Sequence, residues 1–121
     1  GVFPARAEGW NLELLEMMAC GKHVIATNYS AHTEFCNEQN CLLVEAKEKE
    51  EAFDGKWFKG QGNWAKISES EIESISKHMQ SIHESKQNNT LGVNHAGLET
   101  AKKYSWKNSA REIINVLSKS Q

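Results

Sequence analysis

Two carboxylates near the start of the chain, Glu8 and Glu16, are of a residue type that suits ligand binding. A carboxylate accepts hydrogen bonds from sugar hydroxyls with charge-assisted strength. Between the two, Asn11 can begin a helix, and the free amides at a helix start attract an anion such as a phosphate. The combination predicts a ligand that joins a phosphate to a hydroxyl-rich group. On spacing alone, such a pair of glutamates is more typical of a solvated surface.

Other chemistries are less well supported by the residue pattern. The two glutamates have the residue types of a glycosidase acid and base, but hydrolysis does not need a phosphate-binding helix start. A nucleophilic Cys20, with His23 or His32 as its base, would lie at the far end of the helix. His32, Cys36 and Cys41 lack the paired spacing of a structural zinc site. We therefore expect neither a bound metal nor a cofactor.

The stretch 4–28 reads as a loop, a helix and a strand that follow a strand ending at Pro4. Asn11 suits the N-cap, residues 12–20 are good helix formers, and Gly21 suits the left-handed residue after a helix. Residues 23–27 form a short apolar run typical of a buried parallel strand. In such a unit the strand end and the helix start meet at one sheet edge, so we expect a shared crevice there.

The rest of the chain alternates further strands and helices. We expect a short helix capped by Ser30, a strand at 41–44, a helix from Ser68 with a capping box, a helix near 93–104 that is kinked or frayed by Gly97, and a last helix after Ser105. Apolar residues recur at helical spacing in the helices after residue 68, and in the helix from Ser68 they predict packing. Strands alternating with helices favour an α/β fold with a parallel sheet.

Residues 45–70 are the least regular part. The run 45–51 is highly charged and predicts a solvated face or loop. The stretch 53–64 combines three glycines with four large aromatic residues. These rings could stack on a sugar or acceptor, although packing onto the sheet or onto a missing domain is the more usual role of aromatic side chains.

Composition narrows the remaining classes of function. A chain of 121 residues with 39% hydrophobic content suits one domain, and a net charge of −2 gives no argument for nucleic-acid binding. No apolar run approaches the length of a membrane span. Three cysteines, an odd number, favour reduced thiols and a cytoplasmic location, with peripheral attachment to a membrane as an alternative.

About a third of the chain also resembles a known family closely, and the rest resembles it loosely. The spacing of Glu8 and Glu16, followed in register by LEMMACGKHVIAT, is similar to the signature of nucleotide-sugar-dependent glycosyltransferases with the GT-B fold, of the retaining group 1 or family 4 type. The chain departs from that signature at Gly9-Trp10-Asn11, where the family has Gly-Phe-Gly, and at His23, where it has proline. Tyr104-Ser105-Trp106 resembles the aromatic-Ser-Trp step before the final helix of these enzymes.

The resemblance implies a fold and a site. Residues 1–121 would be a single, partial C-terminal donor-binding domain with a Rossmann-like parallel sheet, helices on both faces and a C-terminal helix at 105–121. The N-terminal domain of the same protein would be missing. Glu8 would lie at the transferred sugar and Glu16 at the ribose hydroxyls. Donor binding would also involve the loop residues Gly9, Trp10, Asn11 and Leu12.

The implied activity is transfer of a hexose from a nucleotide-diphosphate sugar to a hydroxyl of an acceptor sugar, lipid or protein, with retention. We expect the 121 residues alone to be inactive. Two alternatives stay open: a non-catalytic module for sugar-nucleotide binding or assembly, and a nucleotide-sugar epimerase-like protein.

Overall fold

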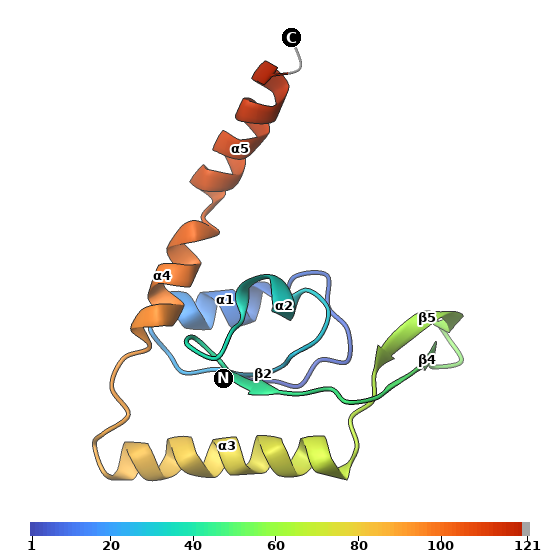
Figure 1. The fold of residues 1–121 in the computed structure, drawn as a ribbon, viewed down its shortest axis with the longest axis vertical. Coiled ribbons are helices and arrows are strands. Elements are labelled where there is room, and N and C mark those ends of the chain that lie inside the picture. Colours follow the sequence, from blue (N-terminus) through green and yellow to red (C-terminus); the bar gives the residue numbers. More distant parts are fainter. Residues whose placement is uncertain (120–121) are drawn as a thin grey trace.

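The computed structural model of the chain describes residues 1–119. Figure 1 shows a small α/β body from which a β-hairpin and a C-terminal helix project. In chain order the elements are β1 (Val2–Phe3), α1 (Leu12–Ala19), β2 (Ile25–Thr27), α2 (His32–Phe35), β3 (Leu42–Val44), β4 (Lys49–Phe53), β5 (Lys59–Ala65), α3 (Glu69–Gln87), α4 (His95–Lys103) and α5 (Trp106–Lys119).

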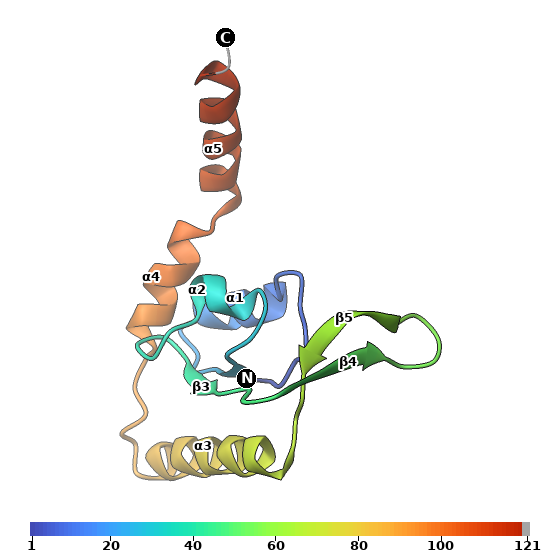
Figure 2. The same cartoon turned by 45° about the vertical axis from the view of Figure 1, so that its right-hand side comes forward.

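The first three strands form a parallel sheet in the order β1-β2-β3. Ala26 of β2 pairs with Phe3 on one side and with Leu43 on the other. α1 connects β1 to β2, and α2 connects β2 to β3. Figures 1 and 2 show α1, α2 and α4 on one face of the sheet and α3 on the other. The expected Rossmann-like α/β fold, with helices on both faces of a partial parallel sheet, is confirmed.

The hydrophobic core lies between α1 and the sheet. Leu14 and Met18 of α1 are fully buried and belong to one cluster with Val24, Ala26 and Phe35. These positions alternate with exposed ones at helical spacing, which is why an eight-residue helix can bury one face. α4 packs against the same helix. The core therefore fixes α1, and with it the loop that precedes α1, on the sheet.

Both ends of α1 agree with the sequence prediction. The side chain of Asn11 accepts a hydrogen bond from the Leu14 amide at 3.2 Å, as an N-cap does. At the other end, Gly21 follows the helix with a φ of +66°, a conformation that costs glycine little. A Cβ at this position would lie 2.8 Å from Cγ1 of Val93. Glycine is therefore required here both for its backbone conformation and for space.

The region 45–70, expected to be irregular, instead forms an antiparallel hairpin of β4 and β5. Residues 49–51, the end of the charged run, belong to β4, where Glu50 pairs with Trp64 and Lys49 with Ala65. A ribbon that is solvated on both sides lacks the apolar alternation by which strands are recognised in a sequence. Three of the aromatic side chains do not pack onto the sheet: Phe53, Trp57 and Phe58 are 60%, 75% and 50% exposed.

The helices after residue 68 form as expected but bury less than expected. The capping box of Ser68 and Glu71 is present at the start of α3. Ile72 and Met79, which we expected to pack, are 57% and 51% exposed. α3 touches the sheet through residues between them, and Nε2 of His78 donates to the Leu43 carbonyl at 3.1 Å. Contact with a narrow, three-stranded sheet leaves the flank of this helix uncovered.

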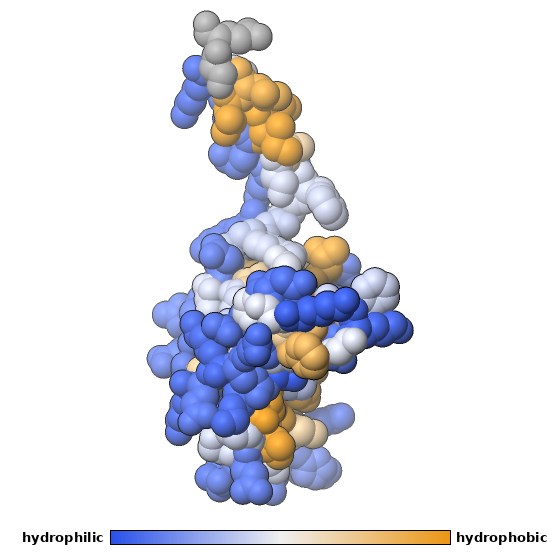
Figure 3. Space-filling model, turned by 90° about the vertical axis from the view of Figure 1, so that its right-hand side faces the viewer, coloured by the Kyte–Doolittle hydropathy of each residue, from blue (hydrophilic) through white to orange (hydrophobic). Residues whose placement is uncertain are grey.

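The last helix, α5, also leaves its apolar side chains exposed. The Ser105 hydroxyl accepts from the Asn108 amide at 3.3 Å, so the predicted cap is present. Trp106 is 82% exposed, and Ile113 and Leu117 are each more than 60% exposed. Figure 3 shows apolar side chains gathered on one face near the end of this helix. Helical spacing predicted this helix correctly, but such spacing reveals an apolar face and not what covers it.

The expected roles of Gly97 and Ser30 were wrong, because each makes a different contact from the one expected. Gly97 does not kink α4; it lies in the first turn, where its amide donates to the side chain of the N-cap residue Asn94 at 2.9 Å. Ser30 does not cap α2, whose N-cap residue is Ala31. The Ser30 hydroxyl instead accepts a hydrogen bond from the amide of Glu8, in the loop before α1. Within residues 1–119, no helix has both the length and the apolar character needed to cross a membrane.

Candidate functional site

The loop before α1 opens onto a hollow of about 360 Å³ at the end of β1. Glu8, Asn11 and Glu13 line this hollow together with the chain around Pro4. Glu8 and Glu13 are exposed, so their carboxylates are available to a ligand. The hollow lies where the strand end meets the helix start, which is the place that the β-loop-α-β pattern predicted.

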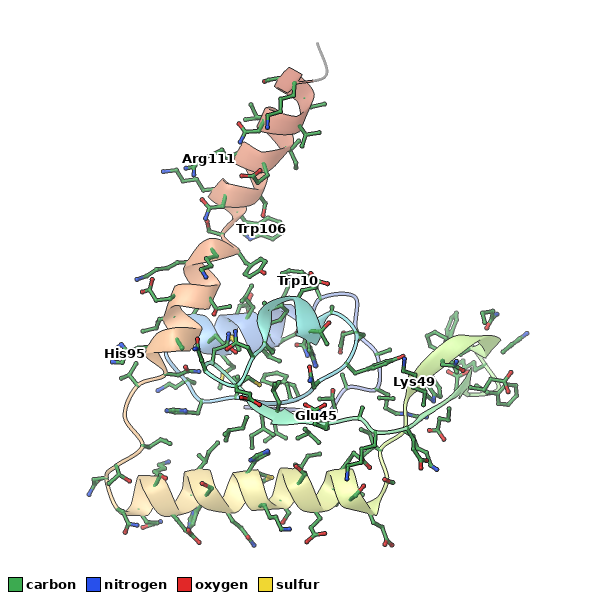
Figure 4. The ribbon with its side chains drawn as sticks, viewed as in Figure 1. Trp10, Glu45, Lys49, His95, Trp106 and Arg111 are labelled. Atoms are coloured by element: carbon green, nitrogen blue, oxygen red, sulfur yellow. The ribbon has the colours of Figure 1, made fainter. Side chains whose placement is uncertain are left out.

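Glu16 lies elsewhere. It lines a larger groove of about 630 Å³ together with Trp10 and Leu12 from the start of α1, and with Tyr104 and Trp106 from the α4–α5 junction. Figure 4 shows Trp10 and Trp106 close to this junction. Glu8 and Glu16 thus line two separate hollows, one on each side of the start of α1, and not the shared crevice that we expected. This separation weakens the interpretation of the pair as a glycosidase acid and base, which must flank one bond.

The backbone between the two hollows supplies hydrogen-bond donors. Among the residues that the structure describes, the amides of Gly9, Trp10, Asn11, Leu12 and Glu13 donate to no protein acceptor. The last two belong to the first turn of α1, where amides have no partner within the helix. The positive end of the helix dipole adds to their attraction for an anion. A run of free amides beside an open hollow is suited to binding phosphate or hydroxyl oxygens.

Contacts from other elements hold this loop in place. The Glu8 amide donates to the Ser30 hydroxyl at 2.9 Å, and the Thr27 hydroxyl donates to the Ala5 carbonyl at 2.5 Å. Thr27 ends β2, and Ser30 follows it in a left-handed conformation with a φ of +52°. The end of β2 therefore ties down the backbone on the N-terminal side of Glu8 and at Glu8 itself.

Trp10 anchors the other end of the loop. Its ring centroid lies 5.0 Å from that of Phe35 and 5.2 Å from that of Tyr104, in the tilted and edge-on geometries that aromatic pairs favour. The Tyr104 hydroxyl donates to the Glu34 carbonyl at 2.9 Å, which fixes the tyrosine in turn. Trp10 thus packs its ring between α2 and α4, while its amide stays free.

The hairpin is attached to the same loop through Arg6. Ala65 of β5 donates its amide to the Arg6 carbonyl at 2.8 Å, and Nε of Arg6 donates back to the Ala65 carbonyl at 3.1 Å. The guanidinium lies 3.9 Å from the ring centroid of Trp64 and also pairs with Glu50. Arg6 therefore joins the hairpin to the backbone two residues before Glu8.

Sequence reasoning missed the residues that support the loop. Arg6, Thr27 and Ser30 carry no recognisable motif, and their role depends on segments that meet only in the folded chain. His32 was weighed only as a zinc ligand or a base, whereas it is completely buried beneath the loop. In residues 1–119 no group of three or more His, Cys, Asp or Glu residues is arranged to hold a metal.

The N-terminal part of the sequence, which contains this loop, is similar to a known protein family. Residues 1–56 match the model of the family described as Glycosyl transferases group 1. The matched segment contains the parallel sheet, α1, α2 and the whole loop from Pro4 to Asn11. This match supports a glycosyltransferase family of the GT-B type and an activity in glycosyl transfer. Neither the curated proteins nor the solved structures gave a match.

Proposed function

We propose that these residues form the C-terminal part of the donor-binding domain of a retaining glycosyltransferase. The enzyme transfers a hexose from a nucleotide-diphosphate sugar to an acceptor hydroxyl. The observation that carries this proposal is the row of free amides at 9–13, which lies beside the Glu8 hollow within the segment that matches the family. An N-terminal domain of the same protein completes the site and binds the acceptor, which is a sugar, a lipid or a protein.

The residues of the loop have distinct roles in this proposal. Glu8 accepts hydrogen bonds from the hydroxyls of the transferred sugar, and the loop amides hold the diphosphate and stabilise the charge that develops on it as it leaves. Trp10 keeps these amides in place through its ring contacts. Glu16 binds the ribose from the second groove, so the nucleotide passes over the start of α1. No metal is required at the diphosphate.

A conservative substitution of Glu8 tests the proposal. Glu8→Gln in the full-length protein removes the charge but keeps the shape, and should lower kcat/KM for sugar transfer by about 10- to 100-fold, the contribution of a hydrogen bond to a charged group. Glu84→Gln is the matched control, because Glu84 lies exposed on α3, on the other face of the sheet. Undiminished transfer by the Glu8 variant would refute the assigned role.

Analysis of the products separates the proposal from its alternatives. A glycosyltransferase links the sugar to the acceptor and releases a nucleoside diphosphate, in the presence of EDTA as well as in its absence. A nucleotide sugar with an inverted sugar carbon would indicate an epimerase instead. Binding without any product would indicate a non-catalytic module. The 121 residues alone should transfer no sugar, and transfer by them would contradict the requirement for an N-terminal domain.

A further inference from the structure

His32 is a buried polar side chain that the proposed chemistry does not use. It is 0% exposed, at the first position of α2. Its Nδ1 lies 2.9 Å from the Thr27 carbonyl oxygen, and its Nε2 lies 2.9 Å from Nδ2 of Asn11. Both ring nitrogens are therefore engaged, one by the end of β2 and one by the residue that begins α1.

These contacts determine which ring nitrogen carries the hydrogen. Oδ1 of Asn11 accepts from the Leu14 amide, so the Asn11 side chain presents its NH₂ group to His32. An NH₂ group only donates, so Nε2 must accept. Nδ1 then carries the hydrogen and donates it to the Thr27 carbonyl. A single neutral tautomer satisfies both of these partners of the ring, whereas a protonated ring would face the Asn11 NH₂ group with a second donor.

The conformation of Asn11 makes this support important. Its backbone has a φ of +73° and a ψ of 74°, in the left-handed region that residues other than glycine seldom adopt. With one end of its side chain held by His32 and the other by Leu14, the residue is fixed in that conformation. Asn11 lies in the middle of the free amides at 9–13, so its φ and ψ determine how the amides before it are directed relative to those after it.

We propose that His32 is a positioning residue of the glycosyl-transfer site: by accepting from Asn11, it holds the loop in the left-handed turn that directs the amides toward the donor. This inference rests on the proposed function for its effect on catalysis, but not for its effect on the loop. The contrasting possibility is a histidine that only fills space in the core.

A cycle of variants in the full-length protein tests the proposal. His32→Leu should lower kcat/KM for the donor by about tenfold, the value of roughly one hydrogen bond. Asn11→Gly is the second member of the cycle whatever its own effect on kcat/KM, because glycine adopts the left-handed conformation without support from His32. In the Asn11→Gly background, His32→Leu should lower kcat/KM only slightly further than Asn11→Gly alone. Equal losses in both backgrounds would overturn the proposal.

An NMR measurement keeps the inference testable without any activity. The ¹⁵N shifts of the His32 ring should show a protonated Nδ1 and an unprotonated Nε2, and the opposite tautomer would overturn the proposal. His32→Leu should shift the amides of residues 9–13 more than His78→Leu does, since His78 is a half-buried histidine on the other face of the sheet. Absence of transfer by every protein, with these shifts as expected, would reject the proposed function and retain the role of His32 in the loop.

Discussion

Replacing Asn94 should destabilise the fold more than replacing any exposed asparagine of the chain. Asn94 is 6% exposed and caps α4 by accepting from the Gly97 amide at 2.9 Å. Its Nδ2 donates to the Asn40 carbonyl at 2.8 Å and to the Lys22 carbonyl at 3.2 Å. One side chain thus ties α4 to the end of α1 and to the start of β3, and so holds one wall of the Glu16 groove.

The structure gives the size of the effect. Losing the cap costs about 1 kcal/mol, and each amide-to-carbonyl bond contributes roughly 0.5–1.5 kcal/mol. Asn94→Ala should therefore lower the free energy of unfolding by about 2–4 kcal/mol, out of a total of about 5–15 kcal/mol for a typical domain. Asn94→Ser keeps a capping hydroxyl and should lose only about 1–3 kcal/mol. The difference between the two variants measures the cap alone.

Urea unfolding followed by circular dichroism measures these changes. Asn88→Ala is the matched control, because Asn88 is exposed at the end of α3, and its free energy should change by less than about 0.5 kcal/mol. Gly97→Ala adds a second test, since a Cβ there would lie 2.6 Å from Nδ2 of Asn94. It should destabilise the parent but much less the Asn94→Ala variant, which lacks that atom. A change below about 0.5 kcal/mol for Asn94→Ala would refute the reasoning.

Three further predictions concern other parts of the chain. Hydrogen bonds from the capping serine of α3 lower the pKa of Glu71 from 4.5 to about 2. The contribution of Glu71 to the free energy of unfolding is therefore present above pH 4.5 and is lost as the pH falls toward 2. Glu71→Gln should flatten the pH dependence of unfolding in that window, and an unchanged profile would contradict this. Cys20 is exposed, whereas a hydrogen bond with Cys41 and burial raise the pKa of Cys36. Iodoacetamide should therefore label Cys20 before Cys36, which mass spectrometry measures, and earlier labelling of Cys36 would contradict this prediction. Arg6→Ala should speed amide hydrogen exchange in β4 and β5, because the hairpin loses its attachment to the loop. Equal protection of these amides in the variant and the parent would argue against that attachment.

The local pattern of the sequence determined the first half of the fold. Asn11, Gly21 and the apolar positions between them define α1, because caps and helical periodicity act over a few residues. The short apolar runs on either side predict buried parallel strands. The same stretch contains Glu8 and the loop that resembles the glycosyltransferase signature. The family match over residues 1–56 supports that resemblance. These features need no information from distant segments.

Only the tertiary structure decided what holds the loop and what covers each apolar face. His32 and Ser30 support the loop because β2 and α2 place them beneath it, and Arg6 joins it to a hairpin whose charged strands show no apolar alternation. Periodicity predicted the helix α5 and its apolar face, and the structure leaves Trp106 on that helix exposed. The physical reason is the same in each case: a periodic pattern reports which face of an element is apolar or polar, whereas contacts between segments far apart in the chain depend on how the elements pack.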